Sequence, residues 1–323
     1  MANLIDQDQL RTVSRVARLY YSYDLKQTQI AKKLEISQAR VSRLLSMADD
    51  LGVVRTMFVA PRGIHPDLEF EVEDKYKLHQ VHIVDGLSDP AVEPFEQLGQ
   101  AAAAVLESMP LEDKNIGFTA WSRSLRETAK SLGRAAKYSS SNAIELLGDV
   151  GSPQVQHEAT MATETFSKAI GAQPVFLRLP SVVSSRALLN SLVDNDAHAS
   201  LALSLMERLD VALLGLGGVD LASPQYAGAN FFNEEQLRVA IGKGAVGQVN
   251  LRFIDANGEP VKTELDDLVI GIKRDQILQT EIRIAAAAGV SKWAAIKAAV
   301  KGGWINVLVT DRSTAEFLLQ SHA

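Results

Sequence analysis

The first fifty residues carry their apolar side chains at the 3.6-residue period of amphipathic helices. Three such stretches predict three short helices, each of which buries one face against the other two. The apolar positions are Leu10, Val13, Ala17 and Tyr20 in the first stretch, Ile30, Ala31 and Leu34 in the second, and Val41, Leu44, Leu45 and Ala48 in the third.

The second and third stretches meet at a three-residue corner, Glu35-Ile36-Ser37. We expect Thr28 to cap the first helix of this pair and Ser37 the second, because a side-chain oxygen accepts a free N–H of the first turn. Two short helices joined by a tight corner are typical of a helix-turn-helix. The run Val53 to Val59 predicts a strand, which would be the wing of a winged variant.

The third stretch has polar side chains at its start, where a recognition helix meets base edges. Glutamine pairs with adenine there and arginine with guanine, whereas lysines nearby suit phosphates. The alternative is an ordinary helical hairpin with a solvated face. The expected contacts to bases are Gln38, Arg40, Ser42 and Arg43, and the expected contacts to the DNA backbone are Lys32, Lys33 and Arg55.

From about Val81 the pattern changes to short apolar runs that alternate with longer helical stretches, down to a last helix at 311–320. Apolar strands separated by helices predict an α/β domain with a doubly wound, mainly parallel sheet. Residues 248–255 are expected to be one of its strands. The predicted organisation is a helix-turn-helix DNA-binding domain at 1–59, a linker at 60–78 that is rich in Pro and Gly, and an effector-binding and oligomerisation domain at 79–323.

The net charge of −6 divides unevenly along the chain. Residues 1–60 hold nine Lys and Arg against six Asp and Glu, a charge of +3, and the remainder carries −9. The basic excess therefore lies in the predicted DNA-reading module, and a charge of +3 suggests an oligomer that presents several copies. The chain has no cysteine, no basic signal segment and no long apolar run, so we expect a cytoplasmic protein without a membrane partner.

Ligands of open α/β sheets bind beyond the carboxyl ends of the strands. Four loops in such positions are rich in Gly, Ser, Arg or Lys: 119–125, 148–153, 215–220 and 288–292. Glycines admit close backbone approach and helix N-termini attract anions, so these loops predict a site for a small phosphorylated ligand. The alternative is that the glycines form tight turns and that the cations are surface charges. The predicted phosphate contacts are Ser122, Arg123, Ser124, Ser291 and Lys292.

Two other classes of protein are alternatives to a regulator. A sugar-phosphate isomerase or deaminase needs a positioned base, but the candidate carboxylates Asp149, Asp220 and Asp255 are scattered along the chain. The six histidines show no metal-ligand spacing, so neither a metal nor a cofactor is expected. A pure assembly protein would have no reason to gather anion-binding residues at strand ends.

Several ordered segments resemble the SorC family of bacterial sugar-responsive transcriptional regulators. They include QTQIAKKLEISQARVSRLL, GFTAWSRSL, ELLGDVGSPQVQHEA, GAVGQVNLRFIDANGEPV and SKWAAIKAAVKGGWINVLVTD. The resemblance implies a helix-turn-helix that binds double-stranded operator DNA, followed by a domain similar to ribose-phosphate isomerases and glucosamine-phosphate deaminases. It also implies a homo-oligomer, usually a tetramer, and a sugar-phosphate or related effector that controls a carbohydrate or polyol operon.

The same resemblance assigns roles in the effector site. The Trp121–Leu125 loop matches a phosphate-binding segment, Gly289 with Lys292 matches a second ligand loop, and Asp255 would lie near the sugar hydroxyls. The alternative for Asp255 is a turn carboxylate, since DANG is itself a turn signal. The full set of predicted effector contacts is Thr119, Trp121, Ser122, Arg123, Ser124, Gly148, Asp149, Gly215, Gly217, Asp255, Gly289, Ser291 and Lys292.

Overall fold

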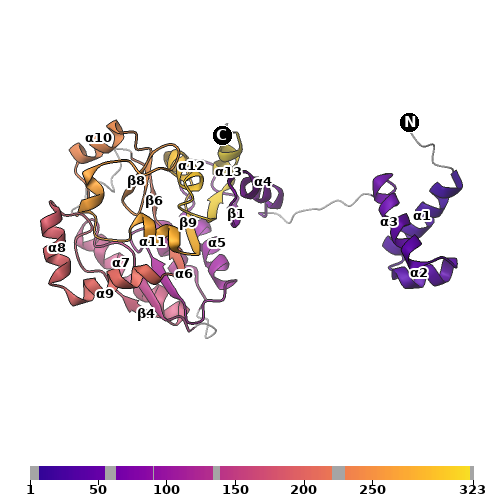
Figure 1. Cartoon of the computed structure of the whole chain (residues 1–323), viewed down its shortest axis with the longest axis horizontal. Helices are drawn as coiled ribbons and strands as arrows, with labels where there is room; N and C mark the ends of the chain where they lie inside the picture. Colours follow the sequence, from indigo (N-terminus) through magenta and orange to yellow (C-terminus); the bar gives the residue numbers. More distant parts are fainter. Residues whose placement is uncertain (1–6, 55–62, 90, 134–138, 220–229, 321–323) are drawn as a thin grey trace. The chain divides into compact units, whose positions relative to one another are not determined.

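A computed structural model describes residues 7–54, 63–89, 91–133, 139–219 and 230–320 of the chain. The chain divides into two compact units, residues 1–60 and 61–323 (Figure 1). No helix among the described residues is long and apolar enough to cross a membrane.

The described residues of the first unit form three helices, as the apolar pattern predicts. Its fully buried core includes Val13, Val16, Ile30 and Val41, one or more from each helix. Leu10, expected in the apolar stripe of the first helix, is instead 42% exposed, and Val16 takes part in the core in its place. The helices are α1 (Gln7–Tyr21), α2 (Gln27–Leu34) and α3 (Gln38–Asp50).

The corner between α2 and α3 forms as expected, but one of its two caps differs. Ser37 caps α3, with its Oγ accepting the Arg40 backbone N–H at 3.2 Å. The prediction of Thr28 as the cap of α2 is wrong, because the helix already begins at Gln27. Lys26 is the capping residue there, and its backbone N–H donates to Gln29 Oε1 at 2.9 Å. The Gln29 side chain therefore helps to fix this start, without a hydroxyl.

The second unit is an α/β domain with two sheets. Its strands are β1 (Gln80–Val84), β2 (Asn115–Phe118), β3 (Asn142–Glu145), β4 (Gln173–Val175), β5 (Val211–Leu213), β6 (Leu216–Gly217), β7 (Gly247–Val249), β8 (Arg252–Ile254), β9 (Ile282–Ala286) and β10 (Val307–Asp311). Its helices are α4 (Pro66–Tyr76), α5 (Phe95–Glu107), α6 (Arg123–Ser131), α7 (Pro153–Ile170), α8 (Arg186–Asp194), α9 (Ala197–Leu205), α10 (Glu234–Gly242), α11 (Arg274–Gln279), α12 (Trp293–Lys301) and α13 (Arg312–Gln320).

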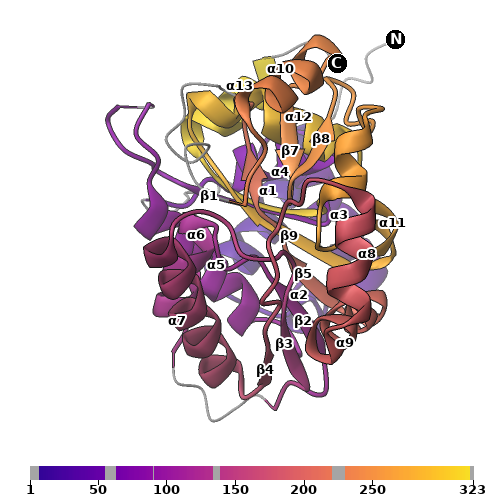
Figure 2. The same ribbon diagram turned by 90° about the vertical axis from the view of Figure 1, so that its left-hand side faces the viewer.

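The main sheet has seven strands in the order β1-β10-β9-β5-β2-β3-β4, and every pairing is parallel. Helices α5, α6 and α7 stand together on one side of the sheet, and α8, α9 and α11 stand on the other (Figure 2). This arrangement confirms the predicted doubly wound α/β fold. It also brings the carboxyl ends of all seven strands to one edge.

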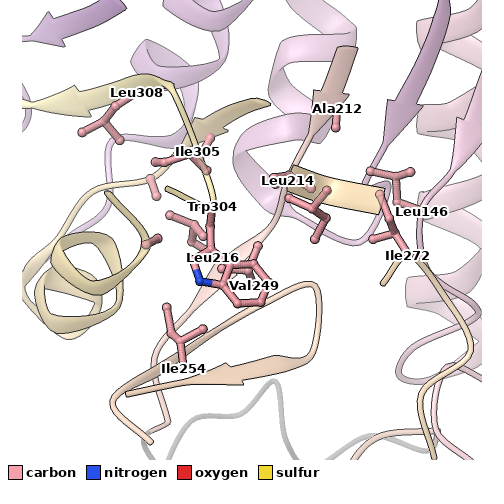
Figure 3. Close-up of a cluster of buried hydrophobic side chains, with 14 of the residues drawn as sticks. Leu146, Ala212, Leu214, Leu216, Val249, Ile254, Ile272, Trp304, Ile305 and Leu308 are labelled. Atoms are coloured by element: carbon pink, nitrogen blue, oxygen red, sulfur yellow. The ribbon is translucent and has the colours of Figure 1, made fainter. Parts of the chain in front are cut away.

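Side chains on the two faces of the main sheet enter two different cores. Ala212 and Leu214 belong to the core shown in Figure 3. This core also includes Val249 of the smaller sheet and Trp304, which precedes β10. Their neighbour Leu213 points to the opposite core beneath α5, α6 and α7. Alternation of this kind follows from the two-residue period of a strand.

The smaller sheet is antiparallel and consists of β6, β7 and β8. Residues 248–255, expected as one strand, form most of a hairpin that turns at Asn250 and Leu251. Both turn residues have positive φ, 45° and 64°, as a two-residue hairpin loop requires. The strand prediction is therefore wrong at the turn, where non-glycine residues adopt a backbone conformation that few of them favour.

Helix α4 lies within the range 60–78 that the sequence suggests as a linker. The structure places it in the second unit, in contact with β1 and α13. Glu73 accepts the Val81 backbone N–H at 2.7 Å, and Glu69 accepts that of Ile83 at 2.9 Å. Lys75 donates to two terminal carbonyls of α13. The stretch with linker-like composition thus contains a helix that is anchored to the domain.

Candidate functional site

Helix α3 has one polar face exposed to solvent, and all four side chains predicted to read bases are exposed on it: Gln38, Arg40, Ser42 and Arg43. Val41 and Leu45, on the opposite face, are buried in the three-helix core. Neither arginine forms an ion pair with a described residue. The Arg40 guanidinium is therefore available to acceptors such as the O6 and N7 atoms of guanine. Arg43 Nε donates to the Ala39 carbonyl at 3.4 Å, which leaves its terminal nitrogens available.

The predicted backbone contacts Lys32 and Lys33 lie in the last turn of α2 and are exposed. Arg55 lies outside the described residues, as does most of the predicted wing strand 53–59. Helix α2 packs against α3, so the two lysines and the polar face of α3 belong to the same unit. This arrangement suits the positioning of a helix-turn-helix on phosphates.

At the carboxyl edge of the main sheet, Thr119 is the centre of a buried hydrogen-bond network. Its hydroxyl donates to the Leu213 carbonyl at 2.8 Å and accepts from Asn250 Nδ2 at 3.0 Å. Asn250 Oδ1 in turn accepts the Gly215 backbone N–H at 2.7 Å. Three segments, the ends of β2 and β5 and the β7–β8 turn, are held together by this network.

A side chain at Gly215 would be tightly packed against its neighbours. A Cβ atom there would lie 3.0 Å from Thr119 Cγ2 and 3.1 Å from Trp121 Cζ2. The fold therefore brings together three of the predicted effector contacts, Thr119, Trp121 and Gly215. The indole N–H of Trp121 is buried and is a donor without a partner among the described residues.

Two predicted phosphate contacts, Arg123 and Lys292, converge on the ring of Phe95 at the start of α5. The Arg123 guanidinium carbon is 4.4 Å from the ring centroid, and Lys292 Nζ is 5.8 Å from it. Arg123 is exposed in the first turn of α6. Lys292 is mostly buried and forms an ion pair with Glu93, with Nζ 2.6 Å from Oε2. Loops separated by about 170 residues of sequence thus place two cations at one aromatic side chain.

The three predicted serines differ in accessibility. Ser122 is half-buried at the capping position of α6, and Ser124 is buried within that helix. Ser291 is exposed in a short 3-10 turn before α12, and its carbonyl lies close to Gly218. Ser122 and Ser291 are therefore open to a ligand at the carboxyl edge, whereas Ser124 has its hydroxyl among protein atoms.

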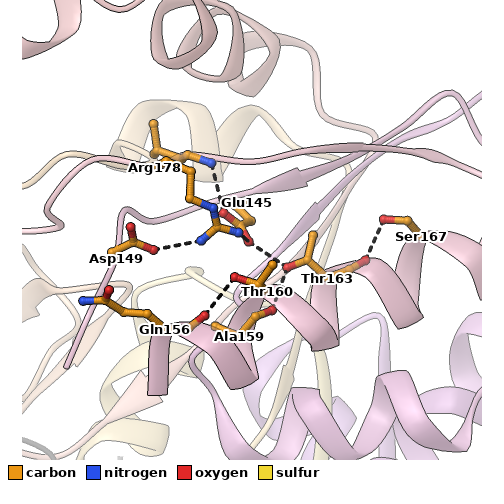
Figure 4. Close-up of polar contacts among 9 residues, drawn as sticks. Glu145, Asp149, Gln156, Ala159, Thr160, Thr163, Ser167 and Arg178 are labelled. Atoms are coloured by element: carbon orange, nitrogen blue, oxygen red, sulfur yellow. Dashed lines mark hydrogen bonds and ion pairs between the residues drawn. The ribbon is translucent and has the colours of Figure 1, made fainter. Parts of the chain in front are cut away.

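Asp149 is held in an ion-pair network that the sequence did not reveal (Figure 4). Arg178 bridges Asp149 at 2.9 Å and Glu145 at 3.0 Å. Glu145 also accepts from Thr163 Oγ1 at 2.8 Å and from the Leu177 backbone N–H at 3.0 Å. Burial raises the pKa of the Glu145 carboxyl, and Arg178 opposes that rise. Asp149 and Glu145 therefore share one guanidinium.

Three predicted glycines have structural roles, two of them in close packing. A Cβ on Gly148 would meet the Leu179 carbonyl at 2.3 Å, and one on Gly217 would meet Gln248 Nε2 at 2.6 Å. Gly289 has a φ of 95° and its N–H donates to Thr314 Oγ1 at 3.3 Å. Only Gly289 has the positive φ of a tight turn, whereas Gly148 and Gly217 allow the close approach of neighbouring segments.

Asp255 occupies the turn that its sequence predicts. Its Oδ1 accepts the backbone N–H groups of Asn257 at 2.8 Å and Glu259 at 3.0 Å. The residue follows β8, whereas Thr119 contacts the turn at the start of that strand. A contact with sugar hydroxyls remains a prediction for Asp255.

Four residues that contact the predicted site residues were not predicted from the sequence: Asn250, Phe95, Glu93 and Arg178. Each contacts a predicted site residue, but each partner is distant along the chain. The Glu93–Lys292 and Thr119–Asn250 pairs span 199 and 131 residues. Among the described residues, no group of three His, Cys, Asp or Glu side chains could hold a metal ion.

Residues 65–320 match the family model described as a sugar-binding domain. Together with the three-helix N-terminal unit, this match defines the class of the protein as a DNA-binding regulator with a sugar-binding domain. The transcriptional regulator LsrR of Escherichia coli (strain K12) is 30% identical over 316 residues, which are 96% of this chain and 94% of LsrR.

Two further relatives align over nearly their whole length. The deoxyribonucleoside regulator of Bacillus subtilis is 27% identical, over 98% of this chain and 99% of its own. The full-length crystal structure of the sorbitol operon regulator SorC from Klebsiella pneumoniae is 26% identical and has a TM-score of 0.72, over 97% of this chain and 100% of SorC. The chain belongs to the SorC family of sugar-binding transcriptional regulators. Members of this family are regulators, so the isomerase or deaminase alternative falls away.

Proposed function

We propose that this chain regulates a carbohydrate or polyol operon in the cytoplasm and that a phosphorylated sugar metabolite controls its affinity for operator DNA. The observation that carries the effector part is the convergence of Arg123 and Lys292 on Phe95, next to the Thr119–Gly215 network. Relatives named as sorbitol operon and deoxyribonucleoside regulators support the choice of operon class.

In this proposal α3 enters the major groove. Gln38, Arg40, Ser42 and Arg43 contact base edges, and Lys32, Lys33 and Arg55 contact phosphates. The unit of residues 1–60 carries a charge of only +3, which gives weak salt-sensitive binding to a single site. A homo-tetramer presents several such units at once, so the affinity of the assembly exceeds that of one unit.

The ligand occupies the carboxyl edge of the main sheet. Arg123 and the open serines hold its phosphate. Effector binding alters operator affinity only if the ligand binds two arrangements of the assembly with different affinities. We infer that this difference in ligand affinity arises in the loops that follow β5 and β9, which contain Gly215 and Lys292.

The experiment is an operator-binding assay with the full chain and a panel of sugar phosphates. Arg123→Ala retains operator affinity and loses the response to the active sugar phosphate. Arg186→Ala, which removes an arginine from the exposed surface of α8, responds like the parent protein. An Arg123→Ala protein that responds normally would refute the placement of the phosphate.

A further inference from the structure

The ion pair between Glu93 and Lys292 changes the charge that the effector site offers to a ligand. Its two charged atoms are 2.6 Å apart, and the side chains are only 16% and 15% exposed. Partial burial strengthens such a pair by reducing the screening of its charges by water. The pair as a whole is neutral, so Lys292 does not present a free positive charge.

The predicted contact Asp149 also has a cationic partner, because Arg178 bridges Asp149 and Glu145. Arg123 contacts Phe95 but forms no ion pair with a described residue. Arg123, Lys292 and Asp149 are charged residues predicted to contact the effector. Among these three, Arg123 is the one that has no oppositely charged partner in the described part of the chain.

We propose that Glu93 is a specificity-determining residue, which makes the site selective for ligands with one phosphate group over ligands with two. This inference rests on the proposed function, because it assumes that the anion binds beside Arg123. A single phosphate finds its counter-charge in the Arg123 guanidinium. A second phosphate near Lys292 meets a neutral pair, loses its hydration without a new cation, and is repelled by the Glu93 carboxylate.

Removal of the carboxylate should convert Lys292 into a second free cation. In Glu93→Gln the side chain keeps its size, and its amide can no longer neutralise the ammonium. The variant therefore gains affinity for more highly charged anions while it changes little toward a single phosphate. Coulomb attraction of this strength near a protein surface gives a gain of about tenfold.

The test measures binding of inorganic phosphate and inorganic pyrophosphate to the full chain by isothermal titration calorimetry. The quantity compared is the ratio of the two affinities. Glu93→Gln raises the ratio of pyrophosphate to phosphate affinity by about tenfold. Glu96→Gln, which removes an exposed carboxylate from the same helix, leaves the ratio unchanged. The double variant Glu93→Gln/Lys292→Met lacks the gain, because it has no second cation.

Three outcomes are distinguishable. A tenfold rise that disappears in the double variant supports the inference. An unchanged ratio in Glu93→Gln, in a protein whose phosphate binding is abolished by Arg123→Ala, overturns it and leaves the proposed function standing. If neither anion binds the parent chain at millimolar concentration, the phosphate site of the proposed function is rejected and the inference falls with it.

Discussion

Asn250 Nδ2 donates a hydrogen bond to Thr119 Oγ1 across 131 residues of sequence, at a distance of 3.0 Å. Both side chains are fully buried, and Asn250 also accepts the Gly215 N–H. The β7–β8 hairpin therefore fixes the loops after β2 and β5 in their positions. A site that is fixed before ligand arrives loses less entropy when the ligand binds.

Asn250→Ala should destabilise the protein by about 2–4 kcal/mol, because Gly215 and Thr119 lose their partners inside the core. The alanine must also adopt the positive φ of this position, 45°. Denaturant unfolding measures the loss, with the exposed Asn190→Ala as the matched control. A change below about 0.5 kcal/mol would show that the network contributes little to stability.

Arg43→Ala should lower the preference for operator over scrambled DNA by roughly 1–3 kcal/mol, the range expected when one bidentate pairing of an arginine with a base is removed. Lys32→Ala is the informative comparison, because a phosphate contact weakens binding to both DNAs alike and reduces the salt slope by about 1. Fluorescence anisotropy over a range of salt concentrations separates the two effects. Equal losses of affinity on both DNAs for Arg43→Ala would exclude it from base reading.

Ser37→Ala should reduce the local stability of the start of α3 by about 1 kcal/mol, because the Arg40 N–H loses its acceptor. Hydrogen exchange of the first-turn amides in the full chain measures this loss. Ser46→Ala, at an exposed position in the middle of the same helix, provides the control. If exchange at Arg40 remained as slow as in the parent, the cap would have no energetic role.

Glu145 should make stability depend on pH. Burial raises the folded-state pKa of Glu145 above its ordinary value of 4.5. The folded state then binds the proton more tightly than the unfolded state does, so protonation of Glu145 stabilises the fold, and this stabilisation is complete below pH 4.5. The stabilisation is lost as pH rises through the raised pKa of Glu145.

Glu145→Gln removes this dependence, since the amide does not titrate. We expect the free energy of unfolding of the variant, relative to that of the parent, to rise as pH increases above 4.5. Chemical denaturation between pH 4.5 and 7 provides the measurement, with the exposed Glu112→Gln as control. A difference between variant and parent that stays constant with pH would contradict a raised pKa.

Helix α3 could be predicted because its determinants are local. The cap at Ser37 and the buried Val41, Leu44, Leu45 and Ala48 all lie within the helix or directly before it. The parallel sheet was predictable for a similar reason, since apolar runs and helical stretches alternate along the chain. Features of this kind need no knowledge of distant partners.

The hairpin at Asn250 and Leu251 depends on distant partners instead. Neither residue gives the Asn-Gly signal of a tight turn, and Leu251 at a φ of 64° is unfavourable by itself. The turn is held by the Leu251 N–H bond to Gln248 Oε1 at 2.6 Å and by the bonds of Asn250 to Gly215 and Thr119. Tertiary contacts therefore override the local preference of the backbone.

The ionic partners were hidden for the same reason. Lys292 and Arg123 could be selected as cations at strand ends, but whether each carries a free charge depends on Glu93, far away in the sequence. Asp149 could likewise be selected, whereas its ion pair with Arg178 could not. Composition identifies the charged residues of a site, and only the fold determines its net charge.

The glutamates of α4 have a consequence for how copies of this chain can meet. Strand β1 is at the margin of the main sheet, where outward N–H groups would attract another strand. Glu69 and Glu73, one helical turn apart, occupy the N–H groups of Ile83 and Val81. Because both N–H groups are already bonded within the chain, they are not available to a strand of another copy at this edge.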